Sequence, residues 1–208
     1  MAYAFSQYGL VQPLTKVDLE LIMINDNTVL NRESMEGDMS IAHSWARLAV
    51  VQPDSREVTL VPGFTATVKL AASETGAISI VEHTFDPGVL IPPHIHSRED
   101  EISCVLSGEI GFRSNGREVS LRAGGYIVKP RGELHSMWNA GAEPARMIEI
   151  ISPAGFEKYF IALAEATAAA GRRPDPSVIA PIAERFGLSY DFSEVPDLVA
   201  RHGLRAPR

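Results

Sequence analysis

The sequence is poor in several features that would assign a protein to a particular compartment or partner. Its 208 residues include one cysteine, Cys104, so the sequence offers no internal disulfide. Acidic residues outnumber basic ones, 26 to 19, and the net charge of −7 disfavours nucleic acid and anionic membranes as partners. No stretch approaches the roughly 18 consecutive apolar residues of a membrane span. The first residues also lack the basic segment and apolar run of a signal peptide, so we expect a cytoplasmic protein.

What the sequence does contain is the composition of an ordinary globular protein, with 45% hydrophobic and 22% charged residues. We divide it into an N-terminal extension over residues 1–45, a β-rich region over 46–152 and a helical segment over 153–208 that packs on the β-rich region. Within the extension, residues 19–24 favour a strand, whereas the pattern of 41–50 fits either a helix or a strand.

The β-rich region alternates short apolar strands with turn residues. Pro87 and Gly88 suit a type II turn, and Asn115-Gly116 is a strong hairpin signal. The expected strands lie at 57–61, 65–71, 76–85, 101–106, 109–114, 117–121, 125–130 and 146–151. Many short strands at this spacing predict an all-β core, either a sandwich or a barrel.

The C-terminal segment has the periodicity and the end signals of helices. Apolar residues recur at helical spacing from Phe156 to Thr167, and Gly171 then provides a stop. Residues 175–187 and 193–203 each combine a proline near the start with a terminal glycine, which is typical of the two ends of a helix. We therefore expect three helices after the β-rich region.

Two histidines one residue apart form the first candidate for chemistry. His94 and His96 follow two prolines at the start of an expected strand, where alternate side chains share one face. Glu101 opens the next strand, so a single hairpin can aim the three side chains at one point. Imidazole and carboxylate groups together suit transition metals. Glu99 and Asp100 are rival carboxylates, which we interpret as parts of a solvated loop.

A wider pattern surrounds these residues. The sequence reads Gly88-x5-His94-x-His96-x4-Glu101-x6-Gly108 and then Gly124-x5-Pro130-x-Gly132-x2-His135-x3-Asn139. All ten positions resemble the two sequence motifs of the cupin superfamily. The resemblance implies a double-stranded β-helix, the cupin or jelly-roll barrel, which holds one divalent transition metal with His94, His96, Glu101 and His135. We interpret the motif glycines as turn and close-approach positions without a chemical role.

The implied ligand set suits catalysis, because four protein ligands on an octahedral ion leave two positions for water, substrate or O2. The metal stays open among Fe, Mn, Ni, Co, Cu and Zn. Asn139 can either orient the ligands or cap a turn, and for His83 we favour an ordinary core or surface position over one that supports the ligands. Four residues that flank the motifs can either line the barrel cavity or pack elsewhere: Tyr126, Lys129, Met137 and Trp138.

Two further stretches, 74–88 and 151–160, resemble small single-domain cupins of the quercetin 2,3-dioxygenase type. This resemblance implies a metal-dependent dioxygenase that acts on a small phenolic or mostly apolar molecule, with Glu101 as a catalytic residue that also moves a proton. The alternative is a non-catalytic cupin that binds metal or a small molecule, because one fold supports many functions. Cupin barrels commonly pair through edge strands, so the resemblance also implies a homodimer.

A DNA-binding regulator is rejected, although residues 182–203 have a faint helix-turn-helix rhythm. Residues 152–208 contain seven basic and seven acidic side chains, so no basic stripe is available for phosphates. Pro196 also falls within the helix that would read the bases. We therefore expect a small molecule as the partner.

Overall fold

The computed structural model describes residues 3–6, 9–13, 51 and 57–206. The chain divides into two units, and the first of them is Met1–Ala42. This unit contains an antiparallel hairpin of β1 (Tyr3–Ser6) and β2 (Gly9–Pro13). The strand expected at 19–24 and the ambiguous segment 41–50 lie outside the described residues.

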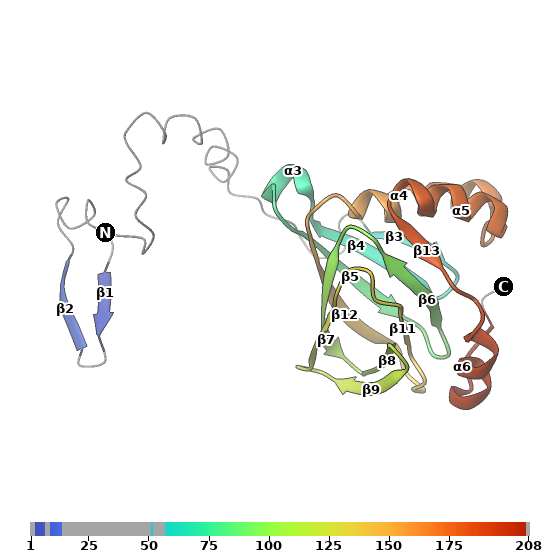
Figure 1. Ribbon diagram of the computed structural model, residues 1–208, viewed down its shortest axis with the longest axis horizontal. Coiled ribbons are helices and arrows are strands. Elements are labelled where there is room, and N and C mark those ends of the chain that lie inside the picture. Colours follow the sequence, from blue (N-terminus) through green and yellow to red (C-terminus); the bar gives the residue numbers. More distant parts are fainter. Residues whose placement is uncertain (1–2, 7–8, 14–50, 52–56, 207–208) are drawn as a thin grey trace. The chain divides into compact units, whose positions relative to one another are not determined.

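The second unit, His43–Arg208, contains two antiparallel sheets that face each other as a barrel (Figure 1). The six-stranded sheet has the spatial order β10 (Tyr126–Lys129), β7 (Asp100–Ser107), β12 (Ala145–Ser152), β5 (Ser79–Phe85), β4 (Phe64–Leu70) and β3 (Glu57–Val61). The five-stranded sheet has the order β13 (Leu188–Tyr190), β6 (Leu90–His96), β11 (His135–Trp138), β8 (Glu109–Ser114) and β9 (Arg117–Arg122). Strands β5 to β8 alternate between the two sheets along the chain, which is the crossover pattern of a jelly roll. The expected all-β core is confirmed.

Alternating burial along the strands fills the space between the sheets. In β5 every second side chain from Ser79 to Phe85 is buried, as the period of two in a strand requires. Large apolar side chains from both sheets meet in this core, among them Phe64, Val81, Phe85, Phe112, Met147 and Ile151. The sequence pattern that predicted strands is thus the pattern that builds the core.

The motif glycines occupy backbone positions that other residues rarely adopt. Gly108 has a φ of 74°, and a Cβ atom there would lie 2.8 Å from the Cβ of Ala145. Positive φ angles also occur at Gly88, Gly124 and Gly132. These values agree with the expected turn and close-approach roles.

Asn139 secures a turn rather than a ligand. Its side-chain amide donates hydrogen bonds to the backbone carbonyl oxygens of Phe85, at 3.0 Å, and Glu143, at 2.8 Å. The backbone N–H of Gly141 donates to the Asn139 side-chain oxygen at 2.8 Å. Of the two roles left open by the sequence, the structure therefore supports the turn cap.

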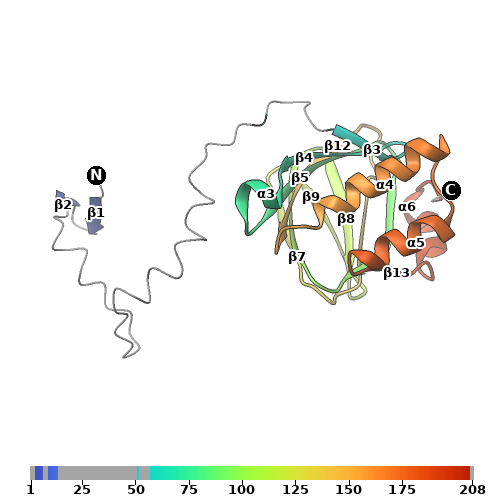
Figure 2. The same cartoon turned by 90° about the horizontal axis from the view of Figure 1, so that it is seen from above.

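Four helices are described in this unit: α3 (Ala72–Thr75), α4 (Glu157–Ala170), α5 (Pro176–Arg185) and α6 (Val195–His202). The three predicted C-terminal helices are confirmed, and α4 ends at Gly171, whose φ of 63° is left-handed. Helix α4 lies against β3 (Figure 2), where Thr167 donates a hydrogen bond to the carbonyl oxygen of Leu60. Within the described residues, no helix combines the length and the apolar character that a bilayer crossing requires.

Candidate metal centre and its cavity

Three histidines reach the barrel interior from two neighbouring strands. His94 and His96 lie two positions apart on β6, so both side chains point inward. His135 begins β11 and lies directly opposite His94 in the antiparallel register. On its other edge β6 pairs with β13, which places Tyr190 opposite His94 and Leu188 opposite His96. The five-stranded sheet thus supplies all three imidazoles.

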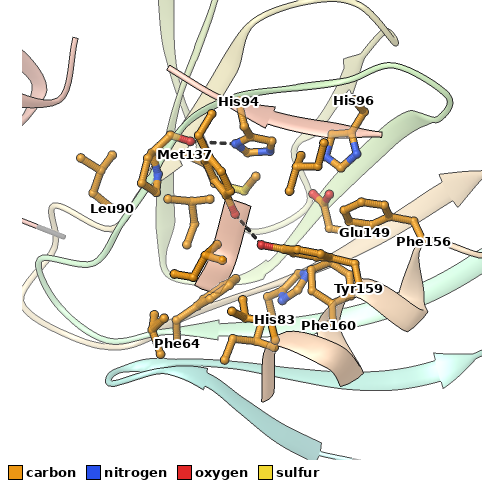
Figure 3. Close-up of a pocket in the computed structure, with 18 of the residues that line it drawn as sticks. Phe64, His83, Leu90, His94, His96, Met137, Glu149, Phe156, Tyr159 and Phe160 are labelled. Atoms are coloured by element: carbon orange, nitrogen blue, oxygen red, sulfur yellow. Dashed lines mark hydrogen bonds between the residues drawn. The ribbon is translucent and has the colours of Figure 1, made fainter. Parts of the chain in front are cut away.

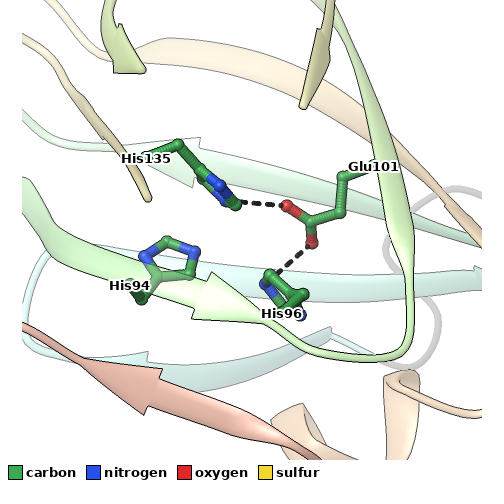
Figure 4. A group of neighbouring side chains, drawn as sticks. All are labelled: His94, His96, Glu101 and His135. Carbon is green, nitrogen blue, oxygen red and sulfur yellow. Dashed lines mark ion pairs between the residues drawn. The ribbon is translucent and has the colours of Figure 1, made fainter. Parts of the chain in front are cut away.

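Glu101 approaches the histidines from the facing sheet. It lies near the start of β7, on the buried face shared by Ser103 and Val105, as expected from the sequence. Its two carboxylate oxygens lie 3.4 Å from Nε2 of His96 and 3.3 Å from Nε2 of His135 (Figure 4). We call His94, His96, Glu101 and His135 the His/Glu cluster. One ligand atom from each of the four lies within 4.8 Å of all the others, and all four side chains are buried.

Backbone carbonyls fix the tautomers of two rings. Nδ1 of His94 lies 2.7 Å from the carbonyl oxygen of Pro92, and Nδ1 of His135 lies 2.9 Å from that of Glu133. A carbonyl oxygen can only accept, so each Nδ1 carries the proton and each Nε2 presents a lone pair. Nε2 of His135 is buried and has no hydrogen-bond partner. A lone pair of this kind, beside a carboxylate and two more imidazoles, fits a transition metal.

Glu99 corrects one sequence interpretation. It is only 7% exposed, so it does not belong to a solvated loop. Its Oε2 lies 3.8 Å from Nδ1 of His96, and both atoms are buried without a hydrogen-bond partner. Asp100 also lies in β7 rather than in a loop, although its carboxylate reaches solvent and accepts hydrogen bonds from Arg131.

Burial sets the protonation state of the cluster. It holds the pKa of His94 well below its usual range, aided by His135 and His96, and it lowers the pKa of His135 because a charged ring would lose its hydration. Burial alone would raise the pKa of Glu101, but its electrostatic interactions with His96 and Lys129 outweigh burial and hold that pKa well below its usual range. Neutral imidazoles and an ionised carboxylate are the forms that bind a metal.

A buried lysine lies directly behind Glu101. Lys129 is 1% exposed and donates hydrogen bonds to Oε2 of Glu101 at 2.9 Å and to the Glu149 carboxylate at 2.7 and 2.9 Å. Ser103 donates a further hydrogen bond to Glu149. We call Lys129, Glu149 and Ser103 the Lys129 network. Burial, followed by the charge of Glu101, raises the pKa of Glu149 to about 7.

An apolar cavity adjoins the cluster inside the barrel (Figure 3). Its volume is about 70 Å³, counted as the space open to the centres of water molecules. Aromatic and aliphatic side chains form much of its wall, among them Phe64, Met137, Phe156, Tyr159, Phe160 and Leu163. Phe156 also meets His96 edge to face, with ring centroids 4.3 Å apart. The cluster is therefore shielded by apolar rings.

The other candidate residues separate into cavity, core and surface positions. Of the core and surface positions that we favoured for His83, the structure shows a core position, stacked on Phe64 with ring centroids 4.9 Å apart, and His83 also lines the cavity. Met137 lines the cavity as well, whereas Trp138 packs in a separate apolar cluster with Leu90. Tyr126 is exposed. Sequence reasoning left Lys129 undecided and missed Glu149 and the cavity-lining Arg173 and Tyr190.

Comparison with known proteins gives the family. The cupin domain family (Cupin_2) matches residues 81–151. The tetracenomycin polyketide synthase protein TcmJ of Streptomyces glaucescens is 31% identical over 122 residues, which are 57% of this chain and 78% of that protein. Oxalate oxidase 1 of Hordeum vulgare is 34% identical over 103 residues, which are 43% of this chain and 51% of the relative. The chain belongs to the cupin superfamily.

The similarity is limited to part of each molecule. The chain spans about half or less of the oxalate oxidases and germin-like proteins that it matches. Among solved structures, KdgF from Halomonas sp. is 21% identical with a TM-score of 0.48, and the match covers 54% of this chain and 99% of that one.

Proposed function

We propose that this cupin is a metal-dependent oxidoreductase, and more specifically a dioxygenase that acts on a small phenolic or mostly apolar molecule. One observation carries the proposal: a buried His/Glu cluster, in which Nε2 of His135 makes no hydrogen bond, adjoins an apolar cavity. The relatives described as oxalate oxidases support an oxidoreductase over the part of the chain that they match. Polar groups at one point of an otherwise apolar pocket are also the usual design of a small-molecule site.

The His/Glu cluster would hold one divalent transition ion. Bound there, such an ion supplies Lewis acidity and, for a redox-active metal, electron transfer. The carbonyls of Pro92 and Glu133 hold the rings of His94 and His135 in the orientation that ligation requires. The position of Phe156 against His96 restricts that ring in the same way.

Glu101 is the residue that we assign to proton movement. Its carboxylate stays ionised, because its pKa lies well below the usual range, so it can accept a hydrogen bond from a substrate hydroxyl. It would take the proton of that hydroxyl where a bound metal lowered the pKa of the hydroxyl. Lys129 binds Oε2 and limits the rotation of the group. The apolar wall meanwhile excludes water and favours an aromatic ring by contact with the phenylalanines.

Elemental analysis of protein purified without added metal tests the proposal. We expect roughly one transition ion per chain in the wild type and a small fraction of that in His135→Ala, because the fourth ligand is lost. His202→Ala is a matched control, since His202 lies on α6 and contacts Glu118 rather than the cluster. Equal metal contents in the wild type and His135→Ala would remove the basis of the proposal.

Oxygen uptake separates catalysis from binding. With catechol or quercetin present, we expect O2 consumption by the metal-loaded wild type and a large decrease in Glu101→Gln. A protein that binds metal but consumes no O2 with any phenol tested supports the alternative of a non-catalytic cupin.

A further inference from the structure

Arg173 carries an unused positive charge at the cavity. It lies between α4 and α5 and lines the cavity that adjoins the His/Glu cluster. It also lines a wider space of about 580 Å³, again counted for water centres, together with Val61 and Leu90, which border both spaces. Arg173 therefore lies where a small inner cavity meets a larger outer one.

The guanidinium group of Arg173 makes no hydrogen bond or ion pair to any residue of the described part of the chain. It is half-buried, and burial lowers its pKa, since the charge has lost part of its hydration. The neighbouring Arg172 is different, because it is exposed and donates to both carboxylate oxygens of Asp175, at 3.2 and 3.3 Å. A half-buried guanidinium without a carboxylate favours an anion from outside the protein.

Two tyrosine hydroxyls lie close to this charge. The hydroxyls of Tyr159 and Tyr190 are 2.6 Å apart, and both groups interact electrostatically with Arg173. Burial raises the pKa of both tyrosines, so both remain protonated. One of the two hydroxyl protons bridges the pair, and the other is free to donate to a ligand. The site thus offers the positively charged guanidinium group of Arg173 and one neutral hydroxyl donor.

We propose that Arg173 binds the carboxylate of a small aromatic acid whose ring lies in the apolar cavity and whose far end faces the His/Glu cluster. The role of the far end rests on the proposed function, whereas the carboxylate subsite rests on Arg173 and the tyrosine pair alone. A guanidinium binds a carboxylate through two parallel hydrogen bonds, which explains why the subsite is selective for a planar anion.

The scale of the cavity limits the acid to about one ring. The ring of Tyr190 lies 5.9 Å from that of His94, centroid to centroid, and its hydroxyl belongs to the pair near Arg173. One tyrosine side chain therefore extends from the cluster towards the anion subsite. Between these two polar ends the wall is apolar, so a benzene ring suits it and a second charge does not.

Calorimetric binding of two matched probes tests this subsite. 4-Hydroxybenzoate and 4-hydroxybenzamide have nearly the same shape and the same phenol, but only the first is an anion. We expect the wild type to bind the acid about 10- to 100-fold more tightly than the amide, as a charged hydrogen bond allows. Arg173→Gln should abolish this preference, because it weakens binding of the acid far more than binding of the amide. Arg172→Gln should retain the preference in full.

Binding of the amide shows whether Arg173→Gln is folded, because an unfolded variant binds neither probe. Arg173→Lys retains the positive charge and should keep part of the preference for the acid. Equal affinity of the wild type for both probes, or an undiminished preference in Arg173→Gln, would overturn the proposal. The same titration in His135→Ala separates the two hypotheses. A preference that depends on Arg173 but persists without metal supports the anion subsite even if the proposed metal chemistry fails.

Discussion

The barrel interior contains two buried polar clusters that are satisfied in opposite ways. In the Lys129 network, the lysine ammonium, both oxygens of Glu149 and the hydroxyl of Ser103 all have partners within the protein. In the His/Glu cluster, Nε2 of His135 and Nδ1 of His96 make no hydrogen bond within the described residues, although each faces a glutamate oxygen, at 3.3 and 3.8 Å. Burial of polar atoms without hydrogen bonds costs free energy, so these two nitrogens indicate a binding site for an ion or ligand from outside the chain. The Lys129 network holds the His/Glu cluster in position through the hydrogen bond from Lys129 to Glu101.

Removal of the Lys129 ammonium group should have the largest effect on the free energy of unfolding. Lys129→Met leaves Glu149 and Glu101 buried without a counter-charge, and we expect the free energy of unfolding to fall by about 3–5 kcal/mol. Denaturant unfolding monitored by circular dichroism measures the change.

A double variant shows whether the loss comes from the stranded carboxylate. Lys129→Met combined with Glu149→Met removes both partners, and it should regain at least about half of the lost stability because apolar replacement of a whole pair is often nearly neutral. A double variant less stable than Lys129→Met would contradict the description of the network as a charge-compensated unit.

Removal of metal from the His/Glu cluster should produce the next largest loss of stability. If the wild type holds an ion at 100 times its dissociation constant, the ion stabilises the fold by about 2.7 kcal/mol. Excess EDTA should therefore lower the stability of the wild type by about that amount, as measured by thermal unfolding. His135→Ala should show little response, and an equal response in both proteins would count against the His/Glu cluster as the binding site.

His83 sharpens the contrast through its dependence on pH, since it lines the same cavity but has a protein partner. Burial lowers its pKa to about 4, against a weaker opposing effect from the carbonyl oxygen of Thr65. The unfolded chain takes up this proton near pH 6.5 and the folded chain does not, so stability is complete above about pH 6.5 and declines as pH falls towards 4. The slope of stability against pH reports how many more protons the unfolded chain binds than the folded chain. Over this window that number should be smaller by about one in His83→Gln than in the wild type. An unchanged slope would show that His83 is charged in the fold.

Much of the fold followed from local patterns in the sequence. Strand alternation placed Glu101 on the same face as Ser103 and Val105, and that face is buried. Gly171 ended α4 where the helical periodicity stopped. The alternation of a strand also placed His94 and His96 on one face. His135 is distant in the sequence, so only the resemblance to the cupin motifs assigned it to the same site.

The remaining features depend on partners that are distant in the sequence. Lys129 is buried because carboxylates of β7 and β12 meet it, and nothing in the residues around it signals that arrangement. Glu99 looked solvated because its sequence neighbours are polar, yet the fold covers it. Strand β13 has three residues between two helices, too few to show a period of two, and its pairing with β6 exists only in three dimensions.

That short strand makes the order of synthesis matter. The outer edge of the strand that carries two of the histidines is paired with residues 188–190, near the end of the described chain. A nascent chain that stops short of them presents an open backbone edge beside its most polar interior, and such edges invite pairing with other chains. The ribosome therefore delivers the two histidines of this strand before it delivers the residues that cover the edge of the strand.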